Sequence, residues 1–323
     1  MSFLVIQQIG PMATVQDLGR RGLSHAGVSG SGPMDMPSFR IANALVGNVE
    51  NSAAIEFGGT GGSFSVLRPA RIAVTGGAVD IRLGKRKLSP WESYTLLPDD
   101  VLSIGALRDC VWGYLAVSGG VDTVPVLGSR ATHVRTGLGG YEGRRLQAGD
   151  RLLLGRDNPG ANLALRQLWR RSGGPVRIVP GPQDDYFSAE TQRAFLKASF
   201  IVSPARDRMA QMLDGHAVHA EGGHDIVSDG TCAGSIQVPA SGRPIVLMAE
   251  RQTTGGYPKI ATVATVDLPR LAQVPSGRHV SFAAISREKA EELLIAERAA
   301  LRERLANLVE KSETNDVSGG MPS

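Results

Sequence analysis

The chain has 323 residues, of which 42% are hydrophobic and 20% charged, enough to build two domains with their own cores. The net charge is +4, but the basic residues are spread out and aromatic residues make up only 5%, so the composition argues against nucleic-acid binding. No apolar run approaches the ~20 residues of a membrane helix, and the N-terminus lacks a basic signal-peptide start. With two distant cysteines, these features predict a soluble, reduced, cytoplasmic protein with neither nucleic acid nor membrane as a partner.

Short strand-like segments bounded by Gly, Pro, Asp or Ser dominate the chain and favour a mainly β fold. The predicted strands are residues 3–8, 54–57, 62–66, 71–75, 79–83, 93–97, 101–104, 111–117, 151–154, 176–179, 236–238, 245–248 and 280–283. A turn followed by a short apolar strand recurs at residues 97–105, 146–155 and 274–282. This recurrence indicates an internal duplication of β units.

The few helices are predicted at residues 37–46, 162–171 and 188–197 and from Ser286 onward, where a broken stripe of Ala290, Leu294, Leu301, Leu305 and Leu308 follows. We therefore expect a first β domain over residues 1–156, a linker helix within 157–174 and a second β domain over 175–285. A C-terminal helix and a loose tail complete the chain over 286–323.

Residues 252–261, QTTGGYPKIA, are the most informative segment, because they join two apolar runs with unusually many hydrogen-bonding groups. The adjacent glycines allow the backbone to approach another group closely or to take positive φ. The segment therefore predicts one wall of a ligand site. The alternative is a Gly-Gly turn whose polar groups face water.

Motifs of several enzyme classes are absent from the sequence. It holds no GxxxxGK[ST] phosphate loop, no GxGxxG between a strand and a helix, no GxSxG elbow and no HExxH. His216, His219 and His224 do not have a standard zinc spacing, and surface imidazoles are the favoured interpretation. We predict no metal site.

Two polar segments of the first half are further candidates. Asp17 and Arg20 follow a strand near a turn glycine. In this position the arginine can bind a carboxylate or phosphate while Asp17 orients it. The alternative is a turn with a local ion pair. Ser29, Ser31 and Asp35 belong to a glycine-rich segment before a helix, where backbone N–H groups can form an anion cradle. The alternative there is a loop that caps the helix.

The second half adds a loop with Arg208, the charged Asp229, and Gln237. Gln237 alternates with Ile236 and Val238, so it points away from their face, either into a site or into solvent.

Seven segments, several of them discussed above, together carry a family resemblance. TVQDLGR, GVSGSGPMDMPSFRIANALVGN, YLAVSGGVD, GLGGYEGR, GPQDDYF, GSIQVPASGRPIVLMAERQTTGGYPKIATV and DLPRLAQV together resemble the biotin-dependent carboxyltransferase / allophanate hydrolase subunit 2-like family, which includes the C subunits of 5-oxoprolinases. The resemblance covers residues 3–285 in order and implies two cyclophilin-like β-barrel domains in tandem. The chain departs from the family pattern RMGxRLxG at Ala210 and Met212, and Glu250 stands where Asp is usual.

The resemblance implies the C subunit of an ATP-dependent 5-oxoprolinase, which opens 5-oxo-L-proline to L-glutamate. Its partners would be the B subunit of 5-oxoprolinase (an allophanate hydrolase subunit 1-like protein) and the A subunit, and ATP would bind elsewhere in the complex. One alternative is a carboxyltransferase that moves a carboxyl group from carboxybiotin, carried by another chain, to a urea- or amide-like acceptor. The other is a non-catalytic regulator that binds a subunit 1-like partner.

The implied reactions build negative charge on a carbonyl oxygen, and fixed donors stabilise such charge. On this basis the candidate catalytic residues are Gln252, Thr253, Thr254, Tyr257 and Lys259. Lys259 is expected to pair with an oxyanion, phosphate or carboxylate. Arg20 and Arg208 would hold the substrate acid group, while Asp17 and Glu250 would orient these cations or move protons. The remaining predicted substrate-binding residues are Ser29, Ser31, Asp35 and Gln237.

Overall fold

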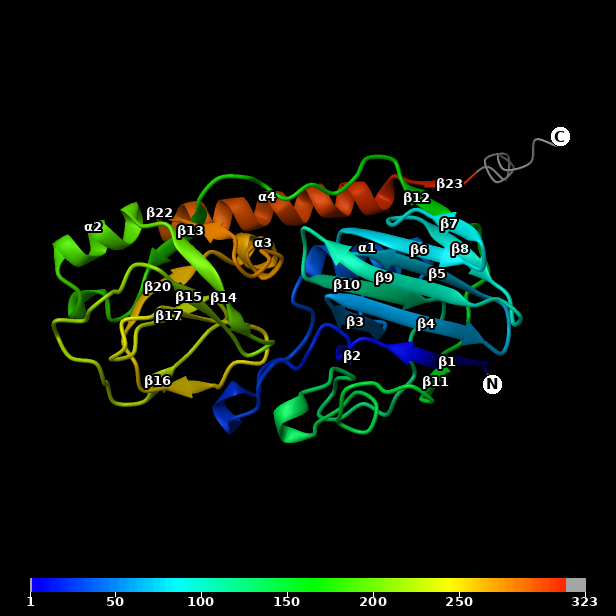
Figure 1. Cartoon of the computed structure of the whole chain (residues 1–323), viewed down its shortest axis with the longest axis horizontal. Helices are drawn as coiled ribbons and strands as arrows, with labels where there is room; N and C mark the ends of the chain where they lie inside the picture. Colours follow the sequence, from blue (N-terminus) through cyan, green and yellow to red (C-terminus); the bar gives the residue numbers. More distant parts are fainter. Residues whose placement is uncertain (1, 312–323) are drawn as a thin grey trace.

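The computed structural model describes residues 2–311, in which strands predominate and form two β units. The units lie side by side, and helix α4 (Arg287–Ala306) runs along the upper side of both (Figure 1). The predicted mainly β architecture of two barrel-like units with a C-terminal helix is confirmed.

The first unit packs two antiparallel sheets around one core. The six-stranded sheet has the order β11 (Arg151–Leu154), β1 (Ser2–Ile9), β4 (Thr60–Val66), β9 (Leu102–Arg108), β6 (Ala78–Leu83), β7 (Arg86–Leu88). The five-stranded sheet has the order β2 (Met12–Gln16), β3 (Ala54–Gly58), β10 (Trp112–Val117), β5 (Ala70–Thr75), β8 (Ser93–Leu96). Because side chains alternate along a strand, Leu115 of β10 faces the core between the sheets while Tyr114 packs on Phe39 of α1 (Met36–Leu45).

The second unit is one eight-stranded sheet. Its order is β21 (His279–Val280), β14 (Phe200–Arg206), β15 (Ala210–Asp214), β18 (Ile245–Leu247), β17 (Ser235–Gln237), β20 (Lys259–Val263), β13 (Val176–Pro180), β22 (Phe282–Ala284). Only Ser281 separates the two edge strands, β21 and β22, so the chain itself nearly closes the sheet into a barrel. In its core the rings of Phe195 and Phe282 stack, and Phe200 packs against both at a tilt.

Smaller elements cover the second barrel. These are α2 (Ala189–Lys197), α3 (Leu268–Ala272), the 3-10 turns η3 (Asp184–Tyr186) and η4 (Thr265–Asp267), and a two-stranded ribbon of β16 (Asp229–Gly230) and β19 (Thr254–Gly255). In the first unit, η1 (Ser24–Ala26) and η2 (Val134–Thr136) lie in loops that Figure 1 shows near the boundary with the second unit.

The predicted linker helix within residues 157–174 is wrong. Leu163–Leu165 instead forms strand β12, which pairs with β23 (Leu308–Glu310) after the end of α4. Pairing satisfies the backbone hydrogen bonds of both segments, and Leu163 and Leu165 pack against the apolar cluster around α1. The extended conformation is therefore more stable here than a short isolated helix. The predicted loop at residues 208–215 is also wrong, because Ala210–Asp214 forms strand β15.

The predicted start of the last helix is confirmed, since Ser286 caps it by accepting a hydrogen bond from the Lys289 N–H. Residues 312–323, the predicted loose tail, lie outside the described residues. The exact domain boundaries and the internal duplication remain predictions. Among residues 2–311, no helix has both the length and the apolar character needed to cross a membrane.

Candidate functional site

A buried ion-pair network at Arg208 joins the two units. From the second barrel, its guanidinium donates to Glu250 (Nε to Oε1, 2.5 Å), to the Gly32 carbonyl oxygen (2.7 Å) and to Glu56 of β3 in the first unit. Glu56 also accepts hydrogen bonds from the Met34 N–H and the Tyr114 hydroxyl, both at 2.7 Å. Each nitrogen of Arg208 therefore already donates within the protein.

Burial controls the charges of this network. It raises the pKa of Glu56, and the Arg208 guanidinium and the Met34 N–H oppose that rise. Burial alone would lower the pKa of Arg208, but Glu56 and Glu250 more than offset this effect and raise it. Arg208 is thus held as a cation between two carboxyl groups.

A cavity of about 220 Å³ lies beside this network and takes its walls from both units. Its lining residues are Met12, Thr14, Trp112, Val134, Arg135, Arg145, Asp207, Arg208 and Glu250. The indole Nε1 of Trp112 is buried without a hydrogen-bond partner among residues 2–311. The cavity therefore combines an apolar wall with charged groups of both signs, which suits a small polar ligand.

Arg20 and Asp17 are both buried but do not bond each other in the described structure. Arg20 donates from Nε to the Val126 carbonyl oxygen (3.1 Å), and its two terminal nitrogens lack hydrogen-bond partners there. Burial lowers the pKa of Arg20, opposed by the charges of Asp17 and Glu250. Asp17 instead accepts from Gly19 N–H, the Ser129 hydroxyl and Arg130 N–H, so it fixes two loops.

Ser29, Ser31 and Asp35, the predicted site residues before α1, have different surroundings and do not form one site. Ser29 donates to the Ala249 carbonyl oxygen (3.4 Å), beside Glu250, whereas the Ser31 hydroxyl is buried without a partner in the described structure. Asp35 is the N-cap of α1, accepting from the N–H and hydroxyl of Ser38, and it also pairs with Arg171 and Gln273. The oxygens of Asp35 are therefore engaged in capping and packing.

Lys259 and Gln237 form the centre of a second polar cluster. They face each other in register on β20 and β17, and both side chains are only 1% exposed. Lys259 Nζ lies 3.0 Å from Asp229 Oδ2, the same oxygen that accepts from Gln183 Nε2 at 3.2 Å. Gln252 donates to Gln237 Oε1 at 3.4 Å, while Gln237 Nε2 has no hydrogen-bond partner in the described structure. We call Gln183, Asp229, Gln237, Gln252 and Lys259 the barrel-mouth cluster.

Gly255 shows why the predicted ligand wall needs its glycines. A Cβ at this position would lie 2.3 Å from Gln237 Nε2, so any side chain at residue 255 would force the Gln237 amide to shift. Thr253 and Thr254 hold this ribbon through backbone pairs with Thr231 and Gly230. Tyr257 is 40% exposed, in agreement with the alternative that part of the segment faces water.

The structure thus divides the predicted site residues into groups. Arg208, Glu250 and Ser29 meet at the boundary between the units, near Arg20, whereas Gln237, Gln252 and Lys259 meet in the barrel-mouth cluster. Sequence reasoning missed Glu56, Trp112 and Gln183. A lone acidic residue inside the apolar strand AIEFG was the available signal for Glu56, because a buried carboxyl group needs partners.

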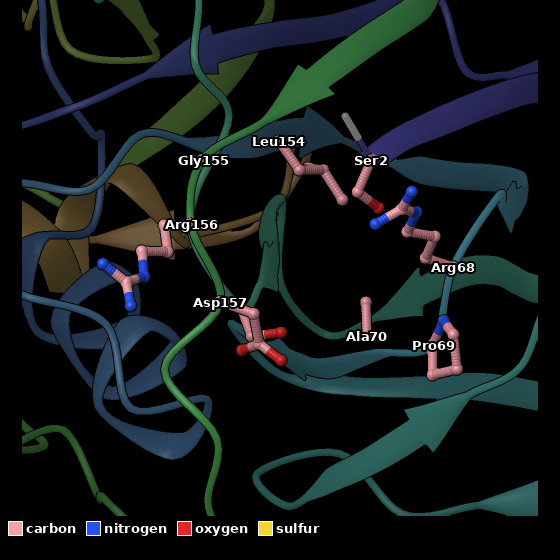
Figure 2. Close-up of a pocket in the computed structure, with 9 residues that line it drawn as sticks. Ser2, Arg68, Pro69, Ala70, Leu154, Gly155, Arg156 and Asp157 are labelled. Carbon is pink, nitrogen blue, oxygen red and sulfur yellow. The ribbon is translucent and has the colours of Figure 1, made fainter.

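Another polar cavity, of about 350 Å³, lies where β11 ends near the start of β1 (Figure 2). Arg68 and Ser2 line one side and Asp157 another, and none of the predicted site residues takes part. In residues 2–311, no group of three or more His, Cys, Asp and Glu side chains is placed to hold a metal ion.

Comparison with known proteins identifies the family. The family model described as carboxyltransferase domain, subdomain A and B, matches residues 26–284. The chain belongs to this family. It is 38% identical over 292 residues to a protein of Escherichia coli K12 that is named as the C subunit of 5-oxoprolinase, covering 89% of this chain and 93% of that one. A protein of Haemophilus influenzae with the same name is 34% identical over 294 residues, covering 89% and 93%.

Solved structures agree with this assignment. The Kluyveromyces lactis urea amidolyase superposes with a TM-score of 0.86 at 27% identity, over 97% of this chain. The urea carboxylase of the same yeast gives 0.83 at 27% identity, again over 97%. The chain spans only 20% and 30% of these two longer proteins.

Proposed function

We propose that this carboxyltransferase-family protein is the C subunit of an ATP-dependent 5-oxoprolinase and helps to open 5-oxo-L-proline to L-glutamate. Two relatives that match nearly their whole length carry that name, which supports the proposal. The partners would be the A subunit of 5-oxoprolinase and its B subunit, the allophanate hydrolase subunit 1-like protein, with ATP bound elsewhere in the complex. A cytoplasmic location remains a prediction.

The observation that carries the proposal is the pair of buried donors in the barrel-mouth cluster. Lys259 Nζ and Gln237 Nε2 lie on neighbouring strands, and the amide nitrogen has no hydrogen-bond partner in the described structure. A buried donor without an acceptor is costly in the free protein, and a ligand oxygen would relieve that cost. Together the two groups can receive one anionic and one carbonyl oxygen, the oxygens that 5-oxo-L-proline offers.

Fixed donors also lower the barrier for opening an amide, because negative charge grows on the carbonyl oxygen in the transition state. Loss of one such donor costs about 3 kcal/mol in well-studied oxyanion holes. Gln252 orients Gln237 by donating to its Oε1, and Thr253 and Thr254 hold the ribbon over both. We assign Tyr257 to the rim of the site, since its ring is partly exposed.

Arg208 takes a different role in this proposal from the one expected from sequence. Because its nitrogens already donate to Glu56, Glu250 and Gly32, it is better suited to hold the two units in register than to bind the substrate acid group. Asp17 and Asp35 are likewise engaged in loop fixing and helix capping. Arg20 keeps free donors and remains a candidate for binding an anion.

Reconstitution of the chain with candidate A and B subunits tests the proposal. We expect glutamate and ADP to form from 5-oxo-L-proline and ATP only when this chain is present. The Lys259→Met variant should remain folded and lose at least ~100-fold in turnover. Full turnover without this chain, or with Lys259→Met in place, would contradict the assigned role.

A carboxyltransferase is the second candidate function. The match to the urea amidolyase and urea carboxylase structures over 97% of the chain favours it. In that case a biotinylated carrier on another chain would deliver the carboxyl group to a urea- or amide-like acceptor. Carboxylation of an acceptor by a carboxybiotin carrier, without glutamate release in the first assay, would favour this alternative; a non-catalytic regulator would show neither activity.

A further inference from the structure

The ion pair of Lys259 joins one of the most buried charges in the protein to an exposed one. The Lys259 side chain is 1% exposed, whereas the Asp229 side chain is 49% exposed. Asp229 belongs to the two-residue strand β16, whose only ladder partner among the described strands is the equally short β19. Its neighbours Val227 and Ser228 are also exposed, so little packing holds this carboxylate in place.

The contacts around Asp229 are those of a bound carboxylate ligand. One oxygen receives the Lys259 ammonium and the Gln183 amide, and the other receives the Gly230 N–H at 2.7 Å. Gln183 is itself fixed, because its Oε1 accepts from the Lys259 N–H at 3.3 Å. The contact with Lys259, followed by the hydrogen bond from Gln183, lowers the pKa of Asp229 below its ordinary value.

Two buried donors of the cluster, Lys259 Nζ and Gln237 Nε2, have no hydrogen-bond partner in the described structure, although Lys259 forms its ion pair with Asp229. Gln237 Nε2 is buried beside Lys259, and Asp229 pairs with Lys259 and accepts from Gln183 but not from this amide. A ligand that carried a carbonyl oxygen next to its carboxylate would satisfy both Lys259 and Gln237, which Asp229 alone does not.

We propose that Lys259 and Gln183 form a carboxylate-binding site that Asp229 closes in the free protein, and that a ligand with a carboxylate beside an amide carbonyl displaces Asp229. Here the identity of the natural ligand, but not the existence of the site, rests on the proposed function. Asp229 then acts as an internal competitor, which lowers the apparent affinity by the fraction of molecules in the open form. Removing its charge should tighten ligand binding about fivefold to tenfold.

Calorimetric titration of the full-length chain tests this proposal with three probes. These are 5-oxo-L-proline, N-acetylglycine as an acyclic carboxylate with a neighbouring amide, and 2-pyrrolidinone as a lactam without a carboxylate. The variants are Asp229→Asn, Lys259→Met and Gln237→Leu. Asp225→Asn is the matched control, because Asp225 is an exposed carboxylate in the same loop.

We expect at least one of the two carboxylate probes to bind, and to bind Asp229→Asn about fivefold to tenfold more tightly than the wild type. The Lys259→Met variant should lose this binding, Gln237→Leu should weaken it, and Asp225→Asn should match the wild type. Binding of 2-pyrrolidinone as tight as that of the carboxylates, or weaker carboxylate binding by Asp229→Asn, would overturn the proposal. The proposal would also be overturned if neither the wild type nor Asp229→Asn bound a carboxylate probe.

The outcome is separable from that of the proposed function. Tighter binding of N-acetylglycine by Asp229→Asn would support the closure of the site by Asp229 even if the reconstituted complex released no glutamate. Conversely, the complex could release glutamate while Asp229→Asn has no effect on ligand binding by the isolated chain. That result would support the proposed function and overturn the closure of the site by Asp229. Circular dichroism of each variant reports folding, and the Asp229→Asn result stands alone if Lys259→Met does not fold.

Discussion

Arg208 in the second barrel reaches across the boundary between the units and pairs with Glu56 in the first barrel. Both side chains are buried, and Tyr114 and Met34 donate to the same carboxyl group. The buried Glu56 of the first barrel therefore takes its cation from the second barrel, and this pair ties the two barrels together.

Replacement of Arg208 by Met should destabilise the protein by about 3–5 kcal/mol, because it leaves the buried Glu56 and Glu250 without their cation. Urea unfolding followed by circular dichroism measures the change. Arg243→Met is the control, since Arg243 pairs with Asp214 at the surface and should cost no more than ~1 kcal/mol. Equal effects of the two variants would refute a special role of the buried pair.

Two adjacent glycines allow a matched test of the barrel-mouth cluster. Gly255→Ala should lower kcat/KM of the reconstituted complex at least ~10-fold, equivalent to about 1.4 kcal/mol, because the new methyl group displaces the Gln237 amide. Gly256→Ala should have little effect, since the nearest atom to a Cβ there is 3.6 Å away. Similar losses from both substitutions would indicate a general need for chain flexibility instead.

Helix α4 has one buried side chain, that of Leu301. Leu301 is 4% exposed and packs in the cluster around α1, whereas Ile295 is 68% exposed. Leu301→Ala should lower the free energy of unfolding by about 2–4 kcal/mol, and Ile295→Ala should change it by less than ~0.5 kcal/mol. Thermal and urea unfolding of both variants check this, and a large effect of Ile295→Ala would show that its exposed face is not inert.

Glu297 on α4 should make stability depend on pH. Burial, together with the charges of Asp35 and Asp267, raises the pKa of Glu297 to about 7, opposed by Arg177 and Arg298. Because the folded pKa lies above the unfolded one, the stabilisation is complete below about pH 4.3 and is lost as the pH rises to about 7. Glu297→Gln should therefore be about 1 kcal/mol more stable than the wild type at pH 8, after allowance for partial exposure.

The check on this prediction is urea unfolding of both proteins from about pH 4, below the unfolded pKa of glutamate, to pH 8. At the acidic end, the protonated glutamic acid resembles glutamine, so the two curves should converge. A constant difference across this range would mean that Glu297 does not titrate as inferred.

Most strands could be predicted from the sequence because their apolar residues are local and bounded by turn residues. The capped starts of α2 at Ser188 and α4 at Ser286 were equally local, since each cap hydrogen-bonds within one turn. The helix predicted at residues 162–171 failed for the opposite reason. Its strand partner β23 lies more than 140 residues further along the chain, and no local pattern reveals such pairing.

The site shows the same division. Gln252 and Lys259 were identified in a segment too rich in donors for a plain turn, and both belong to the barrel-mouth cluster. The sequence by itself thus determined the β character, the family and the polar segment that covers the second barrel. Only the tertiary structure decided that Glu56 engages Arg208 and that Asp229 engages Lys259. Burial and charge pairing depend on how distant segments pack in three dimensions, and local sequence patterns do not reveal that packing.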